Sequence, residues 1–269
     1  MKLLVVLAAL VAAATAYSCG KPAIPPSVSR VVGGQEATPH SWPWQVSLQH
    51  RMGDMWFHSC GATLISPDWI MTAAHCYKRG SAYRVQIGKH RLSNEEEEGA
   101  ITVQIAKVFV HNDYDDHLTR NDIALMWLDH TIDLTDTIQP ACLPRSGAIM
   151  PHNAPCYVTG WGRLSTMGDG SDTLQQALLP IVEYAICKQP DWWSFLMTDK
   201  MVCAGGDGIV GSCMGDSGGP LNCQNSEGIW EVHGAVSFGG SKCNEVKRPS
   251  VFTRISAYTK WINDILMMH

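Results

Sequence analysis

The sequence has few charged residues and no excess of positive charge. Only 17% of its 269 residues are charged, and 20 Lys and Arg stand against 25 Asp and Glu, for a net charge of −5. A protein that binds a phosphate backbone needs cations to neutralise it, so we expect no nucleic-acid partner. The apolar fraction of 45% is ordinary for a globular chain. Intrinsic disorder is therefore not expected, because it requires low hydrophobicity together with high net charge.

No apolar run reaches the roughly 20 residues that cross a bilayer. At the start of the chain, Met1-Lys2 precedes the apolar residues 3–11 and the small residues Ala14-Thr15-Ala16. A basic start, a short apolar run and small residues predict a secretory signal peptide over residues 1–16, although a cut after Ser18 also fits. We therefore expect a secreted, extracellular protein with no membrane partner.

No two of the ten cysteines are separated by only two residues, which is the spacing typical of a zinc site. An even number of cysteines in a secreted chain favours disulfides over bound metal. We expect no metal site. Spacing alone does not determine which cysteines are joined.

The chain shows no regular alternation of strands and helices, which makes a parallel α/β sheet unexpected. Alternating or β-rich runs separated by turn residues predict strands at 44–48, 83–87, 101–105, 157–159 and 230–236. Helical spacing appears only at the end of the chain, at Tyr258, Trp261, Ile262, Ile265 and Leu266. Ser256 is the expected cap of that helix. The fold class is all-β with a C-terminal α-helix, without an internal repeat or a low-complexity linker.

One serine lies between glycines in Gly215-Asp-Ser-Gly-Gly219, where a tight backbone can expose its hydroxyl. The pattern also fits the nucleophile turn of α/β-hydrolases, which place the acid and the histidine after the serine. Only 52 residues follow Ser217 here, and they contain no βα units. Upstream, His75 and Asp122 precede Ser217 in the chain order used by chymotrypsin.

The sequence from Cys19 to its end resembles a trypsin-like serine protease zymogen of the chymotrypsin fold. The motifs that carry this resemblance are Arg30–Gly34, Ser41–Leu48, Thr72–Cys76, Asn121–Leu125, Thr159–Gly162, Gly215–Gly219 and Ser237–Gly239. Within the family it is most similar to the pancreatic chymotrypsin-like elastases of the second type and to chymotrypsin C. That closer similarity rests on residues 156–164, 201–208 and 249–254.

The resemblance implies two antiparallel β-barrels with the active site between them, followed by the C-terminal helix. Residues 17–30 would be an activation propeptide and residues 31–269 the peptidase domain, active as a monomer. The implied disulfides are Cys19–Cys142, Cys60–Cys76, Cys156–Cys223, Cys187–Cys203 and Cys213–Cys243.

The resemblance also implies a catalytic mechanism that needs no cofactor. His75 would take the proton of Ser217 and return it to the leaving amine, while Asp122 would orient His75. The backbone N–H groups of Gly215 and Ser217 would form the oxyanion hole. The alternative is a catalytically silent binding protein of the same fold. Such chains usually have a replaced triad residue or a damaged activation sequence, and this chain has neither.

The activation sequence implies a cut between Arg30 and Val31 by a trypsin-like protease. The new amino group of Val31 would then pair with Asp216. The expected partners are this activator, protein and peptide substrates, and protein inhibitors of proteases.

Six positions are expected to contact the substrate: Gly211, Met214, Ser237, Phe238, Gly239 and Ser250. Trypsin-like members carry an Asp at the position of Gly211, so cleavage after Lys or Arg is disfavoured here. Because Gly239 and Ser250 are small, we expect an open, neutral pocket, slightly deepened by Gly211. The sequence therefore predicts cleavage after Leu, Met, Phe or Tyr in dietary protein, without ranking them.

Tight calcium binding is not expected, because Lys89 occupies the position of an acidic calcium ligand in related proteins. The run Glu95–Glu98 is interpreted as a solvated loop tip that could recruit an ion loosely. Trp192-Trp193 is interpreted as loop packing. The histidines at 40, 58, 111 and 152 are assigned no role.

Overall fold

The computed structural model describes residues 18–28 and 34–269, and it consists mainly of β-strands in two closed barrels. The first barrel has the strand order β2-β3-β4-β7-β6-β5, and β2 pairs with β5 to close it. Its strands are β2 (Gln45–Met52), β3 (Met55–Ser66), β4 (Trp69–Thr72), β5 (Tyr83–Ile87), β6 (Ile101–Val110) and β7 (Ala124–Leu128).

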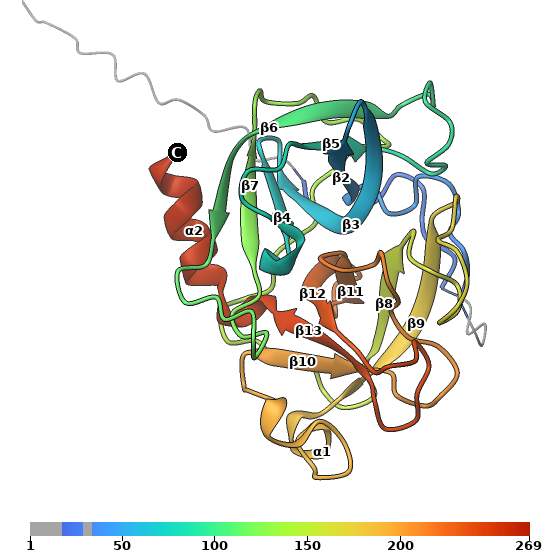
Figure 1. Ribbon diagram of the computed structural model, residues 1–269, viewed down its shortest axis with the longest axis vertical. Helices are drawn as coiled ribbons and strands as arrows, with labels where there is room; N and C mark the ends of the chain where they lie inside the picture. The colour runs from blue at the N-terminus through green and yellow to red at the C-terminus, as the bar shows by residue number, and fades with distance from the viewer. Residues whose placement is uncertain (1–17, 29–33) are drawn as a thin grey trace, which may run out of the picture.

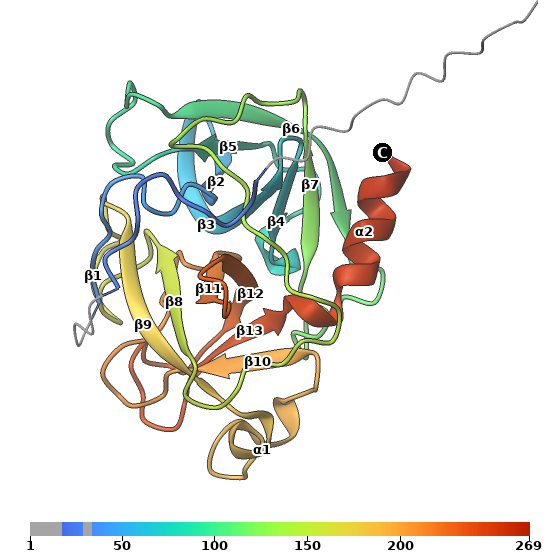
Figure 2. The same ribbon diagram turned by 180° about the vertical axis from the view of Figure 1, so that it is seen from behind.

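The second barrel has the order β9-β10-β13-β12-β11-β8, and an antiparallel pairing of β8 with β9 closes it. Its strands are β8 (Pro155–Gly160), β9 (Gln175–Val182), β10 (Met201–Ala204), β11 (Pro220–Gln224), β12 (Trp230–Phe238) and β13 (Ser250–Arg254). The short strand β1 (Gln35–Glu36) adds to β9. Figures 1 and 2 show the two barrels one above the other. The predicted all-β architecture is confirmed.

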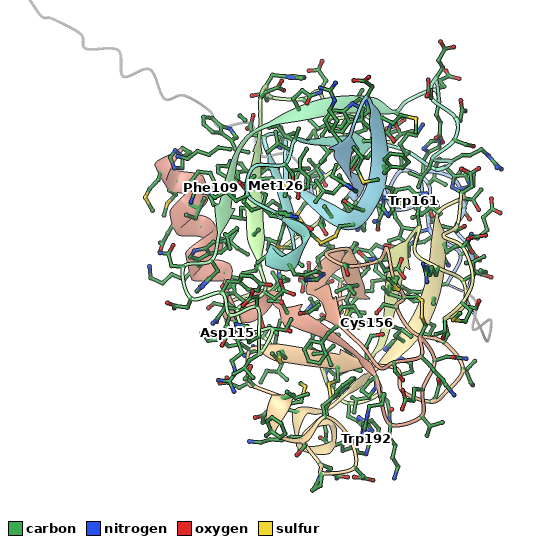
Figure 3. All side chains as sticks on the ribbon, viewed as in Figure 1. Phe109, Asp115, Met126, Cys156, Trp161 and Trp192 are labelled. Carbon is green, nitrogen blue, oxygen red and sulfur yellow. A yellow bond between two sulfur atoms is a disulfide. The ribbon has the colours of Figure 1, made fainter. Side chains whose placement is uncertain are left out.

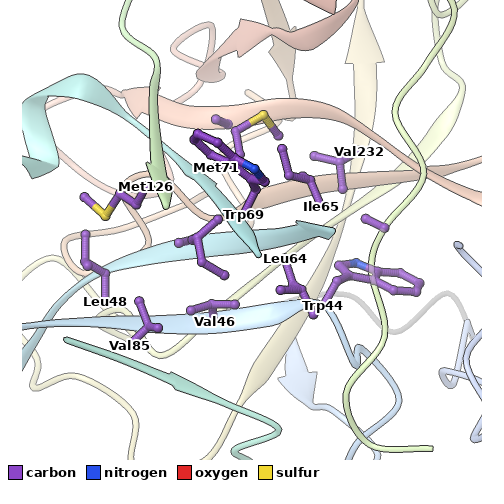
Figure 4. Packing of buried hydrophobic residues seen from close by; sticks show 14 of the residues in the cluster. Trp44, Val46, Leu48, Leu64, Ile65, Trp69, Met71, Val85, Met126 and Val232 are labelled. Atoms are coloured by element: carbon purple, nitrogen blue, oxygen red, sulfur yellow. The ribbon is translucent and has the colours of Figure 1, made fainter. Parts of the chain in front are cut away.

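Barrel closure follows from strands that are apolar on the inward face. In the first barrel, Val46, Leu48, Leu64 and Val85 are fully buried and pack together, as Figure 4 shows. Closing the sheet removes the unpaired edges that an open sheet would expose. Four of the five predicted strand segments lie wholly within strands, and the segment 83–87 has the predicted bounds. The fifth segment, 44–48, starts one residue before β2.

The remaining elements are short helices. They are the 3₁₀ turns η1 (Ala74–Cys76), η2 (Ser194–Leu196) and η3 (Ile255–Ala257) and the α-helices α1 (Tyr184–Cys187) and α2 (Thr259–Met268). Helix α2 lies beside β6 and β7 of the first barrel (Figure 1). It buries Ile262 there. Among the described residues, no helix is long and apolar enough to cross a membrane.

The expected cap of α2 is wrong. Ser256 lies within η3, and its hydroxyl donates to the Ala148 carbonyl oxygen at 2.5 Å. The helix begins at Thr259 without a side-chain cap. The 3₁₀ turn delays the start of the α-helix, so the serine bonds to a distant loop instead.

The structure contains the five disulfides that the resemblance implies, and they use every cysteine. Figure 3 marks the position of Cys156, which is joined to Cys223 inside the second barrel. Cys19–Cys142 closes the longest loop and ties the described N-terminal segment 18–28 to the body. Gly20 adds two backbone hydrogen bonds there, to Pro140 and Trp230.

Two indole groups join the barrels. The Nε1–H of Trp42 donates to Gln176 of β9 at 2.9 Å, and the Nε1–H of Trp44 donates to Asn222 of β11 at 2.7 Å. All four side chains are buried. A buried indole N–H needs an acceptor. These bonds therefore set how the first barrel docks on the second.

Replacing Asn222 with Leu should destabilise the protein. The Trp44 N–H would lose its acceptor and the Tyr157 carbonyl oxygen would lose the donor at 3.1 Å. The free energy of unfolding in denaturant should fall by about 2–4 kcal/mol. Gln224→Leu, at the exposed end of the same strand, should change it by less than about 0.5 kcal/mol. Equal effects of the two variants would contradict this role of Asn222.

Candidate active site

The buried carboxylate of Asp122 orients the side chain of His75. Asp122 precedes β7 and is fully buried, and it accepts hydrogen bonds from His75 Nδ1 at 2.7 Å and from the His75 backbone N–H at 3.0 Å. An ionised carboxylate can only accept, so the Nδ1 contact places the imidazole proton on Nδ1. Nε2 is then free to accept a proton. The side chain of His75 is 30% exposed, so this nitrogen can be reached by a reactant.

The second barrel also holds Asp122. The Ser237 hydroxyl on β12 donates to its carboxylate at 2.6 Å, and the Thr253 hydroxyl on β13 donates to its backbone carbonyl at 2.7 Å. Ser237 was predicted as a substrate contact, and it lines a cavity beside Ser217 as well. Its hydroxyl, however, is directed to Asp122. The local sequence around Ser237 contains no signal for that bond.

Close backbone contacts bring Ser217 to the segment that carries His75. The Gly61 N–H donates to the Ser217 carbonyl oxygen at 2.8 Å, and the neighbouring Cys60 is bonded to Cys76. A Cβ on Gly218 would lie 2.9 Å from the Ala73 nitrogen, so only glycine permits this approach. Within the described residues, the Ser217 hydroxyl makes no hydrogen bond to His75. Catalytic hydrogen bonds are often long without substrate.

The backbone at Gly215 has φ of +102°, which favours glycine. Its carbonyl oxygen accepts a hydrogen bond from His58 Nε2 at 3.1 Å. Among the described residues, the N–H groups of Gly215 and Ser217 have no acceptor. Unpaired N–H groups are rare in proteins. The N–H groups of Gly215 and Ser217 are thus two donors, two residues apart, that can bind an oxygen atom of a substrate.

His58 has a role that the sequence analysis missed. Its Nδ1 is 2.8 Å from the Ser47 hydroxyl and its Nε2 contacts Gly215. Burial lowers the pKa of His58 to about 4, against the smaller opposing effect of the Gly215 carbonyl. The ring is therefore neutral at physiological pH and donates to Gly215 from Nε2. Gly215 is 157 residues away in the chain and Ser47 lies on the neighbouring strand β2, so no local pattern indicated these contacts.

Asp216 is buried beside the serine. Its oxygens accept from the backbone N–H groups of Gly162 at 2.9 Å and Cys213 at 2.8 Å. Burial raises the pKa of Asp216 to about 6, and the two N–H donors partly offset this. A Cβ on Gly160 would lie 2.1 Å from its carboxylate, which explains the glycine before Trp161. A cavity of about 250 Å³ adjoins Asp216. Arg30 and Val31 lie outside the described residues.

A second cavity, of about 220 Å³, adjoins Ser217. Its lining includes four of the predicted substrate contacts and, among the residues that the structure describes, no Asp or Glu. The lining residues are Thr166, Ser212, Cys213, Met214, Ser217, Val236, Ser237, Phe238, Gly239, Gly240, Ser241 and Cys243. Ser212 was missed by the sequence analysis, although it lies only five residues before Ser217. Nothing approaches the Cβ position of Gly239 within 4 Å, so this side of the cavity is open.

Gly211 and Ser250 are not in the lining of that cavity, but both adjoin Ser212, which is; their contact with substrate stays a prediction. A Cβ on Gly211 would lie 2.2 Å from the Cys243 carbonyl oxygen. The backbone of Cys243 therefore fills the space that the missing side chain was expected to leave, so Gly211 does not deepen the pocket. The Ser250 hydroxyl accepts hydrogen bonds at 2.8 Å from both the N–H and the hydroxyl of Ser212.

The described residues bring together one group of potential metal ligands, Cys60, His75 and Cys76. The two sulfur atoms form a disulfide and cannot coordinate as thiolates. In the loop 89–97, the Lys89 side chain is 2% exposed, and its ammonium contacts the Asn94 carbonyl and lies 3.5 Å from Glu97. Glu97 also accepts from the His90 N–H, so it is turned inward rather than solvated as predicted.

The fold and the site define a class of protein. Two closed antiparallel barrels, an Asp-oriented histidine and a serine bonded through its backbone to the segment that carries this histidine are the arrangement of a serine protease of the chymotrypsin fold. The family described as Trypsin matches residues 31–262. The chain therefore belongs to the trypsin family of serine endopeptidases.

Curated relatives agree with this assignment. Chymotrypsin-C of Bos taurus is 53% identical over 95% of this chain and 96% of its own length. Chymotrypsin-C of Rattus norvegicus is 51% identical over 98% of each chain. Chymotrypsin-like elastase family member 3B of Homo sapiens is 45% identical, also over 98% of each chain. The chain is an enzyme of the chymotrypsin- and elastase-like group, whose triad chemistry needs no cofactor.

The ammonium of Lys89 should make the loop 89–97 independent of calcium. A chelator should leave the melting temperature unchanged, because the cation that neutralises Glu97 is part of the chain. Lys89→Met should lower the free energy of unfolding by about 3 kcal/mol, since it leaves a largely buried carboxylate unpaired. Lys78→Met, at an exposed position, is the matched control. A large fall in melting temperature on chelation would contradict the prediction.

Proposed function

We propose that the chain is a secreted digestive endopeptidase, made as an inactive precursor and active as a monomer, that cleaves after Leu, Met, Phe or Tyr. Ser217 is the nucleophile, His75 the general base and Asp122 the group that orients it. The N–H groups of Gly215 and Ser217 bind the oxyanion, where one donor contributes roughly 3–4 kcal/mol to the transition state. The unpaired state of these donors supports that role. Protein substrates and protein inhibitors are its partners.

Secretion and activation involve the part of the chain before residue 34. Residues 1–16 are the signal peptide and residues 17–30 the propeptide, which stays attached through Cys19–Cys142. Disulfides of this kind suit an oxidising compartment. A trypsin-like protease cuts between Arg30 and Val31. Two observations support this: the family match begins at residue 31, and Gly34 lines the cavity that contains Asp216.

Arg30→Gln should prevent activation by trypsin. Trypsin requires a basic residue before the bond it cuts, so the variant should stay inactive towards a chromogenic peptide. Lys21→Gln changes the other basic residue of the propeptide and should activate at the normal rate. Normal activation of Arg30→Gln would refute this scheme.

The cut should change how stability depends on pH. In the uncut chain, burial raises the pKa of Asp216 to about 6 from 3.8. The folded state therefore binds more protons than the unfolded state between about pH 4 and 6, and its stability falls as pH rises through that window. The loss reaches about 3 kcal/mol at neutral pH. In the cut chain, the protonated amino group of Val31 pairs with the Asp216 carboxylate. The stability of the folded state then no longer falls between about pH 4 and 6 on account of Asp216.

Denaturant unfolding of both forms measures this effect. Ser217→Ala prevents self-digestion during the experiment. The cut form should become more stable relative to the uncut form as pH rises from 4 to 7. Parallel pH profiles of the two forms would exclude the pairing of Val31 with Asp216.

The cavity beside Ser217 carries the specificity proposal. It has no carboxylate in its lining and stays open at Gly239. A basic side chain would find no counter-ion there. Burying a Leu, Met or Phe side chain in the cavity contributes about 1.5–3 kcal/mol to substrate binding. An Ala side chain is too short to make the same contacts. Cleavage after Ala, Lys or Arg is therefore slow.

Gly239→Val should narrow the cavity. No described atom lies within 4 Å of the Gly239 Cβ position, so the backbone can carry a side chain there. The ratio of kcat/KM for a Phe peptide to that for an Ala peptide should fall by at least about tenfold. Wild-type cleavage after Ala or Arg faster than after Leu or Phe would refute the assignment of this cavity.

A further inference from the structure

A cluster of contacts surrounds Arg248, which lies just before β13. Its Nη1 is 2.7 Å from the carbonyl oxygen of Asp191, 2.6 Å from that of Trp192 and 3.0 Å from that of Lys247. The guanidinium carbon also lies 5.5 Å from the centre of the Trp193 ring. Arg248 thus joins the loop that follows α1 to the loop that follows β12. Figure 3 shows Trp192 at the far end of the second barrel.

The same cluster continues to the cavity beside Ser217. The Trp193 Nε1–H donates to the Pro249 carbonyl oxygen at 3.0 Å. Its ring meets the ring of Phe238 edge to face, with 5.3 Å between their centres and 87° between their planes. Phe238 lines the cavity. A continuous chain of contacts therefore runs from Arg248 through Trp193 to Phe238.

We propose that Arg248 is a positioning residue for specificity: it fixes Trp193, which fixes the Phe238 wall of the cavity. This rests on the proposed function of that cavity as the site for the side chain before the cut bond. The planar guanidinium can bond to several carbonyls and stack on an indole at the same time, which an ammonium cannot do. Substrates with a large side chain contact the wall and depend on its position. A substrate too small to reach it does not.

Lys247 is a matched control next to Arg248. Its ammonium pairs with Asp191 at 2.6 Å, so it also joins the two loops. Both of these side chains are about half exposed, and exposed pairs contribute little. Unlike Arg248, Lys247 has no contact with an aromatic ring among the described residues.

The test compares Arg248→Lys with Lys247→Met in the activated full chain. Each sample is first labelled with a fluorophosphonate to count active Ser217. Two substrates are then used: a chromogenic peptide with Phe before the cut bond, and p-nitrophenyl acetate, whose acetyl group does not reach the wall. We expect Arg248→Lys to lower kcat/KM for the peptide about tenfold, mainly through KM. Its rate with the ester and all rates of Lys247→Met should stay within about twofold.

A double-mutant cycle tests the route through Trp193. In a Trp193→Ala background, Arg248→Lys should have no further effect on the peptide. Additive effects, or an equal loss with peptide and ester, would overturn the proposal. If Arg248→Lys does not fold, Trp193→Phe replaces it: a selective loss with the peptide supports the relay and unchanged selectivity overturns it. Failure of the activated wild-type chain to label at Ser217 would instead overturn the proposed function.

Discussion

The buried carboxylate of Asp122 constrains both barrels at once. A charge without water needs hydrogen-bond donors, and Asp122 takes them from His75 in the first barrel and from Ser237 in the second. The Thr253 hydroxyl holds the backbone of the same residue. The same hydrogen bonds to Asp122 therefore fix how the two barrels dock and how the His75 ring is oriented. A shift of either barrel would leave the carboxylate short of donors.

Glycines let the two barrels approach closely enough for this arrangement. A Cβ on Gly61 would lie 2.8 Å from Gly219 Cα, and one on Gly218 would lie 2.1 Å from the Thr72 hydroxyl oxygen. Side chains at these positions would separate Ser217 from the segment that carries His75. The glycines around the serine thus serve packing across the barrel interface as well as exposure of the hydroxyl.

The second barrel holds both Asp216 and the cavity beside Ser217. Asp216 is buried with N–H donors but no cation among the described residues, and burial raises its pKa accordingly. The cavity beside Ser217 is bounded by backbone as much as by side chains, because the Cys243 carbonyl occupies the space beside Gly211. The positions of the loops therefore shape this pocket together with the types of its side chains.

Of the thirteen described strands, the sequence by itself predicted five. It also predicted the C-terminal helix and, by resemblance, the triad order and the disulfide pairs, because periodicity and motifs are local signals. The strand 83–87 has the predicted bounds for that reason. Local signals failed for Ser256, whose hydroxyl bonds to Ala148 instead of capping the helix, and for Glu97, which turns inward to Lys89. Only the tertiary structure decided that His58 contacts Gly215 and that Cys243 fills the space beside Gly211. Those contacts join residues far apart in the chain, and they exist only after the barrels close and pack.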